Sequence, residues 1–212
     1  MNSIRLTSAL LTLLPWAAIG QNQTLDLDRE AELRIQNFQF EDGFEMELFA
    51  DQTQVINPSA ICFDEQGRLF VAEIHRWRAG VEDIRHHIPM LLDDLSIVTS
   101  EDRLEMYRKH SESAHIPFEK WTEFADSIRR VEDGDGDGRA DSSVVWADGF
   151  NAALDGPGIG LVYRDGRLYY TNIPHLWMLE DADDDGQAEK RESLQDGFGV
   201  RMSISGHDMH GA

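Results

Sequence analysis

The stretch Asp133-Gly-Asp-Gly-Asp-Gly-Arg-Ala-Asp141 has a second copy further along the chain, Asp181-Ala-Asp-Asp-Asp-Gly-Gln-Ala-Glu189. Both copies follow the pattern D-x-D-x-D-G-x-x-[DE]. The offset from Asp133 to Asp181 also separates the Asp-Gly-Phe tripeptides that come after them, which end at Phe150 and Phe198. A fixed period of about 40–50 residues is typical of repeat folds, above all of β-propeller blades. The sequence therefore predicts an all-β chain that forms the N-terminal blades of a β-propeller.

Strand patterns surround the two acidic copies. Residues 59–63 and 68–72 are short apolar runs on either side of an Asp/Gly turn, and 160–163 with 167–171 repeat this hairpin. Residues 44–49 alternate apolar and acidic side chains, which predicts one more half-buried strand. We expect blade one at about 58–150, blade two at about 156–199 and the start of a third at 200–212. A helical insertion is expected at 78–127, with Thr99 or Ser100 as the N-cap of a helix over 101–110.

Composition and the N-terminus narrow the setting of the protein. Residues 1–20 resemble a secretory signal, with Arg5 before an apolar run that is short for a membrane span, so we expect export to the periplasm or beyond. An uncleaved anchor is the alternative; after cleavage no stable span is expected. Residues 21–37 are a polar, exposed lead-in before the propeller part, 38–212. The net charge of −21 argues against nucleic acid as a partner.

The acidic copies are candidate calcium loops. Calcium takes six to eight oxygen ligands, and alternate acidic side chains around a tight glycine turn supply them. The expected ligands are Asp133, Asp135, Asp137 and Asp141 in one loop and Asp181, Asp183, Asp185 and Glu189 in the other. Position 12 of an EF-hand loop needs a bidentate Glu, and the first copy has Val144 there. The neighbouring strand patterns favour β-hairpin loops over EF-hands, and a solvated acidic turn is the alternative to a metal site.

Two further groups of polar residues could carry chemistry. Equivalent positions after the second strand of each hairpin hold Glu73, His75 and Arg76 in unit one and Asn172 and His175 in unit two. They belong to one face of a propeller, where they either bind a ligand or cap loops by hydrogen bonding. The segment Gly206-His-Asp-Met-His-Gly211 places His207 and His210 on either side of Asp208, as a general base or a pair of metal ligands, or as ordinary loop histidines.

At these residues the chain resembles a known family. Glu41-Asp-Gly-Phe-Glu-Met-Glu-Leu-Phe49, the hairpin ending at Glu73, the Asp-Gly-Asp-Gly loop and Ser205-Gly-His-Asp-Met-His-Gly211 resemble the membrane-bound dehydrogenase domain of planctomycete-type bacteria. That domain is similar to soluble glucose/sorbosone dehydrogenases, which use pyrroloquinoline quinone (PQQ) with Ca²⁺. The resemblance implies oxidation of a sugar or polyol, His207 as the general base, and a cytochrome c as a candidate electron acceptor. The chain has no C-x-x-C-H haem motif of its own.

Three functions follow from these patterns. The first is the N-terminal part of an exported PQQ dehydrogenase, inactive by itself because about four to eight blades are needed to close a ring. The second is a non-catalytic, calcium-stabilised propeller that binds carbohydrate or protein. The third is a complete small protein that assembles through its open blade edges. Quinone bleaching on addition of sugar distinguishes the first from the second.

Overall fold

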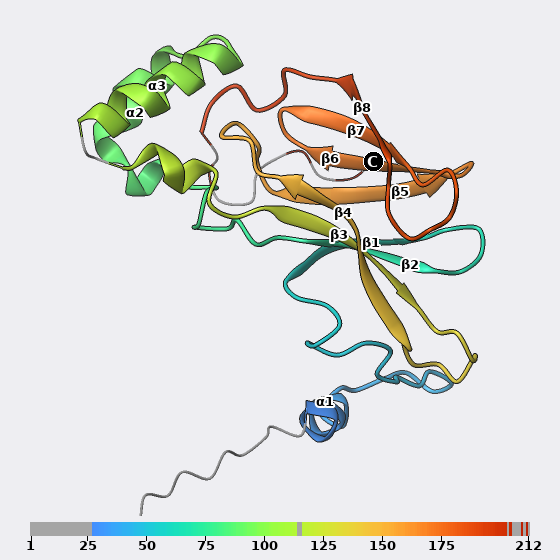
Figure 1. Ribbon diagram of the computed structural model, residues 1–212. Helices are drawn as coiled ribbons and strands as arrows, with labels where there is room; N and C mark the ends of the chain where they lie inside the picture. The colour runs from blue at the N-terminus through green and yellow to red at the C-terminus, as the bar shows by residue number, and fades with distance from the viewer. Residues whose placement is uncertain (1–26, 114–115, 203, 205–208, 210, 212) are drawn as a thin grey trace, which may run out of the picture.

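The computed structural model describes residues 27–113, 116–202, 204, 209 and 211, and two four-stranded antiparallel sheets dominate them (Figure 1). The first sheet contains β1 (Pro58–Phe63), β2 (Leu69–Glu73), β3 (Asp126–Glu132) and β4 (Ser142–Phe150), and the second contains β5 (Gly158–Arg164), β6 (Arg167–Asn172), β7 (His175–Glu180) and β8 (Lys190–Gln195). In both sheets every strand pairs with its neighbour in the sequence. The predicted all-β class is confirmed.

The two sheets repeat each other in register as well as in strand order. A bulge interrupts the first pair of each sheet near its start, at Pro58/Ala60 and at Gly158/Gly160. The last pair of each sheet also shifts register at a matching place: between Ile128–Ala147 and Arg129–Val145 in the first, and between Leu176–Gln195 and Trp177–Ser193 in the second. The first sheet has a further shift between Asp126 and Ile128. The two matching shifts are separated by the same offset as the two acidic copies. The sequence period is therefore a period of the structure.

The main hydrophobic core lies between the two sheets. The first sheet contributes a face that includes Phe70, Ile128, Trp146 and Phe150, and the second contributes Leu161, Leu168, Tyr170 and Leu179. β1 lies beside β5, where the Ser59 hydroxyl donates to the Gly158 carbonyl oxygen at 2.6 Å. A Cβ on Gly158 would lie 1.5 Å from the Tyr170 hydroxyl oxygen, so only glycine fits there. Close packing of aromatic rings from both sheets stabilises their mutual orientation.

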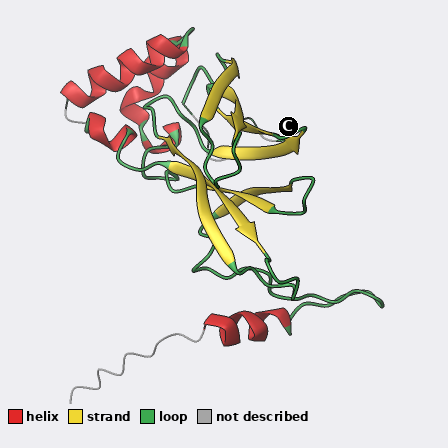
Figure 2. Cartoon of the chain, turned by 45° about the vertical axis from the view of Figure 1, so that its right-hand side comes forward, coloured by secondary structure: helices red, strands yellow, loops and turns green. Residues whose placement is uncertain are grey.

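The segment between β2 and β3 forms a helical group at one end of the sheets (Figures 1 and 2). It contains η1 (Ile84–His86), η2 (Ile88–Met90), α2 (Leu91–Ser96), α3 (Ser100–Glu112) and η3 (Phe118–Trp121). Thr99 caps α3 in a capping box with Asp102, so the predicted N-cap is confirmed. The helices have a core of their own, in which the Tyr107 and Trp121 rings stack at 3.9 Å. No helix that the structure describes has the length and apolar character to cross a bilayer.

The N-terminal part differs from expectation. α1 (Leu27–Ile35) is an additional helix in the polar lead-in, with a Glu30–Arg34 ion pair at 2.6 Å one turn apart. The strand predicted at 44–49 is wrong: this segment pairs in no ladder among the described residues. Its Phe44 side chain is 73% exposed and its Met46 side chain 41% exposed. Alternation alone does not make a strand, because the backbone groups of a strand need a partner.

Candidate metal centres in two acidic loops

The acidic copies form the tips of two equivalent hairpins. The first acidic loop, residues 133–141, joins β3 to β4, and the second acidic loop, residues 181–189, joins β7 to β8. Strands on both sides rule out the helix–loop–helix of an EF-hand. Gly138 and Gly186 occupy the same place in the two loops with φ values of 90° and 97°, a left-handed conformation that favours glycine. The glycine of the shared pattern thus serves the turn.

The backbone of each loop folds around its own carboxylates, and the two loops do so alike. The Asp133 carboxylate accepts from the amides of Asp137 and Gly138 at 3.2 and 2.9 Å, and the Asp181 carboxylate accepts from those of Asp185 and Gly186 at 3.2 and 3.1 Å. The last acid closes each loop: Asp141 accepts from Gly134 at 2.7 Å and Glu189 from Ala182 at 3.0 Å. The acids therefore hold a defined turn in each loop.

The carboxylates of each loop come within range of a single ion. In the second acidic loop, Asp181, Asp183, Asp185 and Glu189 each have an oxygen within 4.8 Å of the others. The first loop brings Asp133, Asp135 and Asp141 together in the same way. Asp137, the fourth predicted ligand there, lies outside this group, and its carboxylate accepts from the Arg139 amide at 2.8 Å. Because all donors are carboxylate oxygens, the sets suit a hard cation such as Ca²⁺.

Like charges crowd the second loop most. The pKa of Asp183 is raised above its ordinary value, by burial first and then by the charges of Asp185 and Glu189. The pKa of Asp133 is lowered, chiefly by the Gly138 amide, and that of Glu189 by the Ala182 amide. Backbone donors therefore offset part of the repulsion, and a bound cation would relieve what remains at Asp183.

The second acidic loop also binds to the first sheet. The Asp181 carboxylate accepts from the Trp146 indole at 3.2 Å and from Arg130 at 3.3 Å, and the Ala188 amide donates to the Trp146 carbonyl at 2.8 Å. Asp184, at the loop tip, accepts from Arg68 at 2.6 Å and from Arg130 at 3.1 Å. This loop therefore fastens one sheet to the next. Sequence patterns missed these partners, because Arg68 and Arg130 lie 116 and 51 residues from the acids that they contact.

The polar residues predicted for a ligand-binding face are mostly occupied by the protein itself. Glu73 is buried and accepts from Arg129, Ser127 and the Ile56 amide at 2.9, 3.0 and 2.7 Å. Asn172, its equivalent at the end of β6, is also buried and donates to the Gly156 carbonyl at 2.6 Å. Both therefore stabilise the fold at equivalent places in the two sheets.

The remaining candidates divide into buried and accessible groups. Arg76 is buried and donates to the carbonyls of Trp121, Ala152 and Asp155. His75 and His175 are partly exposed; the first contacts the Ser127 hydroxyl at 3.3 Å and the second the Ser193 hydroxyl at 3.0 Å. His207 and His210 lie outside the described residues, as does the expected signal at 1–20.

Replacing Asp126 by asparagine should change how stability depends on pH. This buried carboxylate accepts from the amides of His75 and Arg76 at 2.8 and 2.9 Å, and burial, as the main cause, raises its pKa above the ordinary 3.8. A raised pKa means that the stability Asp126 contributes is complete below the unfolded-state pKa and is lost as pH rises through the folded-state pKa. The free energy of unfolding of Asp126→Asn, relative to that of the wild type, should therefore increase as pH rises from the unfolded-state pKa to the folded-state pKa. Urea unfolding of both proteins at several pH values measures this, and a constant difference would contradict it.

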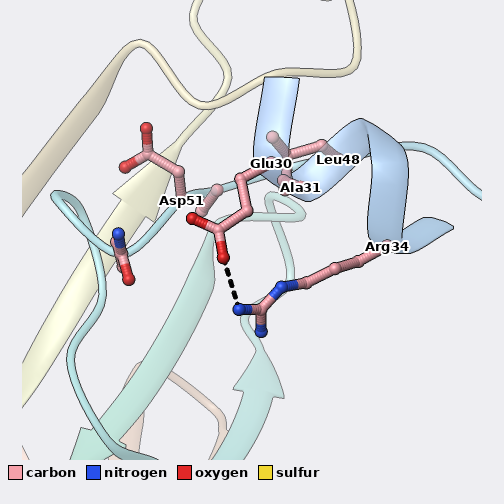
Figure 3. Close-up of a pocket in the computed structure, with 7 residues that line it drawn as sticks. Glu30, Ala31, Arg34, Leu48 and Asp51 are labelled. Atoms are coloured by element: carbon pink, nitrogen blue, oxygen red, sulfur yellow. Dashed lines mark hydrogen bonds and ion pairs between the residues drawn. The ribbon is translucent and has the colours of Figure 1, made fainter. Parts of the chain in front are cut away.

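Two hollows flank the N-terminal part. A pocket of about 170 Å³ lies between α1 and residues 48–52 (Figure 3), and its Glu30 and Arg34 pair with each other while Asp51 accepts from Thr53. A larger hollow of about 400 Å³ lies beside the first acidic loop and is lined in part by Glu47, Asp137 and Arg139. The first hollow uses its charges internally, so the acidic loops remain the strongest candidate site.

Comparison with known proteins gives one match. The profile of a protein family described as "Domain of unknown function (DUF7133)" matches residues 30–209, most of the chain. No curated protein and no solved structure matches.

Proposed function

The chain belongs to the DUF7133 family of domains of unknown function, and from that premise we propose that it is a calcium-stabilised part of a β-propeller. In this proposal each four-stranded sheet is one blade, and each acidic loop binds one Ca²⁺. The ion fixes the outer hairpin of its blade, and at the second loop it also fixes the contact with the preceding blade. The protein then serves as an exported scaffold for binding carbohydrate or protein, outside the cytoplasm as residues 1–20 suggest.

The packing of the sheets supports the propeller. Blades are four-stranded antiparallel sheets that follow one another in the chain and pack face to face around an axis. The two sheets here share strand order and bulge positions, and they bury one core between their faces, with β1 beside β5.

One observation carries the calcium assignment: two loops at equivalent places in the repeat fold the same backbone around the same carboxylates. Acidic turns without a ligand have no need to place several like charges within 4.8 Å, since this repulsion opposes folding. No imidazole or thiolate joins either group among the described residues, which favours Ca²⁺ over zinc.

Asp183→Asn should weaken calcium binding at the second loop by about tenfold or more, because it removes one charged ligand without changing size. Titration of the metal-free protein with Ca²⁺ against a chelator dye measures the affinity. Asp184→Asn is the matched control: its carboxylate pairs with Arg68 and Arg130 and lies outside the ligand group, so we expect less than about a threefold change.

EDTA should lower the Tm of the wild type by about 5 °C or more. Equal behaviour of the two variants, or no response to EDTA, would remove the calcium proposal.

The dehydrogenase activity implied by the resemblance is the second proposal. It rests on the quoted motifs and on His207, which would take the substrate hydroxyl proton. The described residues fit PQQ poorly, because Glu73, Arg76 and Asn172 are buried and form hydrogen bonds with the protein's own groups. We therefore expect no dye reduction when the purified chain is mixed with PQQ, Ca²⁺ and glucose or sorbitol. If the chain oxidises the sugar and His207→Ala abolishes this activity, the dehydrogenase proposal would take precedence over the scaffold proposal.

A further inference from the structure

Residues 44–50, called here the edge segment, copy the outer strand of the first sheet. The end of the edge segment and the residue after it read Phe49-Ala50-Asp51, and the corresponding part of β4 reads Trp146-Ala147-Asp148. An aromatic residue, alanine and aspartate thus recur in the same order, although the edge segment pairs in no described sheet.

A backbone hydrogen bond gives the edge segment the same position as β4. The Ala188 amide of the second acidic loop donates to the Trp146 carbonyl at 2.8 Å. The Ala140 amide, at the equivalent place in the first acidic loop, donates to the Phe49 carbonyl, also at 2.8 Å. The second loop therefore contacts the outer strand of the sheet before it, and the first loop contacts the edge segment in its place.

The packing repeats in the same way. Leu168, Tyr170 and Leu179 belong to the second sheet. The face of the first sheet that includes Trp146 and Ala147 covers them. The equivalent residues of the first sheet are Leu69, Val71 and Val131, and the structure covers them with Phe49, Ala50 and Val55. A whole sheet thus covers this face of the second sheet, whereas the edge segment covers only the outer part of the equivalent face of the first sheet.

We propose that the edge segment is the fourth strand of a further sheet of this repeat, whose first three strands form an antiparallel sheet with a free edge. This rests on the propeller arrangement proposed above. That three-stranded sheet would pair with residues 44–49 by β-strand addition and cover the rest of the Leu69–Val71–Val131 face. An intact second copy is not the occupant, because both sheets of the chain already contain four strands.

The test uses a probe with the required free edge: a copy of this chain that ends at Glu189 and so lacks β8, and that carries both Glu45→Pro and Met46→Pro so that its own edge segment cannot pair with another copy. The full chain should bind this probe in a 1:1 complex by analytical ultracentrifugation, and the full chain by itself should stay monomeric. A peptide of residues 188–198, the probe's own missing strand, should compete. No complex with a folded probe, or self-association of the full chain that equals its binding to the probe, would overturn the proposal.

Two adjacent proline variants distinguish strand pairing from general contact. Neighbouring amides of a strand point to opposite edges, so only one of Glu45→Pro and Met46→Pro removes a donor from the ladder. Both side chains are exposed, so neither substitution disturbs a core. We expect one variant to bind the probe about tenfold or more weakly and the other to bind within about threefold of wild type. Equal effects of the two would contradict strand addition.

A strand transplant decides the matter without the probe. In the full chain, residues 190–195 are replaced by Glu45-Met-Glu-Leu-Phe-Ala50, which puts Phe49 in the place of Leu194, and a Gly-Ser sequence of equal length is the control. If the edge segment can form a fourth strand, β7 amides should keep their protection from hydrogen exchange in the transplant and lose it in the control. Equal loss in both would overturn the proposal. Calcium titration of the same proteins at the first acidic loop tests the metal site separately.

Discussion

Arg76→Met is expected to lower the free energy of unfolding by about 3–5 kcal/mol, since it leaves buried groups without their charged partner. The Arg76 side chain is 0% exposed, and it donates to the carbonyls of Asp155, Trp121 and Ala152 at 2.8, 2.7 and 3.1 Å. Burial lowers the pKa of Arg76, while the charges of Asp155 and Asp126 oppose this. One guanidinium therefore joins the end of β2, the helical group and the connection between the two sheets.

The comparison that isolates this effect is Arg78→Met. Arg78 is an exposed arginine two residues further along, so its replacement should change stability by less than about 0.5 kcal/mol. Urea unfolding followed by tryptophan fluorescence measures both. A loss below about 1 kcal/mol for Arg76→Met would mean that water satisfies the three carbonyls, and that Arg76 is available for another role.

Local sequence patterns predicted the strands and the helix cap whose interaction partners lie close to them in the sequence. Each hairpin of the two sheets brings its pairing strand with it across a short turn, so the apolar runs and the Asp/Gly turns were sufficient. The Thr99 cap was visible for the same reason, because its partner Asp102 lies three residues away. Residues 44–49 have the same alternation but no nearby strand, and their prediction failed.

Long-range partners could not be predicted. Arg68 and Asp184 are 116 residues apart, and Arg130 and Asp181 are 51 apart, so no spacing rule connects them. The recurrence of Glu73 and Asn172 was visible, but their burial was not, and burial turns two candidate ligand-binding residues into structural ones. In the first acidic loop the pattern gave four ligands, whereas the fold gathers three. Asp137 lies outside the group, although Asp137 and its equivalent Asp185 both accept from the amide two residues further along.

Phe150→Ala is expected to lower the free energy of unfolding by about 3–5 kcal/mol, as for other large buried aromatic residues. Phe150 is 0% exposed, its ring lies 4.8 Å from that of Tyr170, and the Arg191 guanidinium lies 4.1 Å from its centre. The substitution leaves a cavity where the two sheets meet. Thermal and urea unfolding of the purified chain measure the loss.

Phe198 is the built-in control, because it ends the second Asp-Gly-Phe just as Phe150 ends the first. It is 39% exposed, so Phe198→Ala should reduce stability by less than about 1 kcal/mol. The difference arises because the second sheet packs on the face near Phe150, whereas the matching face near Phe198 has no sheet on it among the described residues. If a further blade covers that face in a larger assembly, Phe198→Ala should there reduce stability about as much as Phe150→Ala. Equal effects of the two substitutions in the chain by itself would contradict this packing, and with it the arrangement of successive blades.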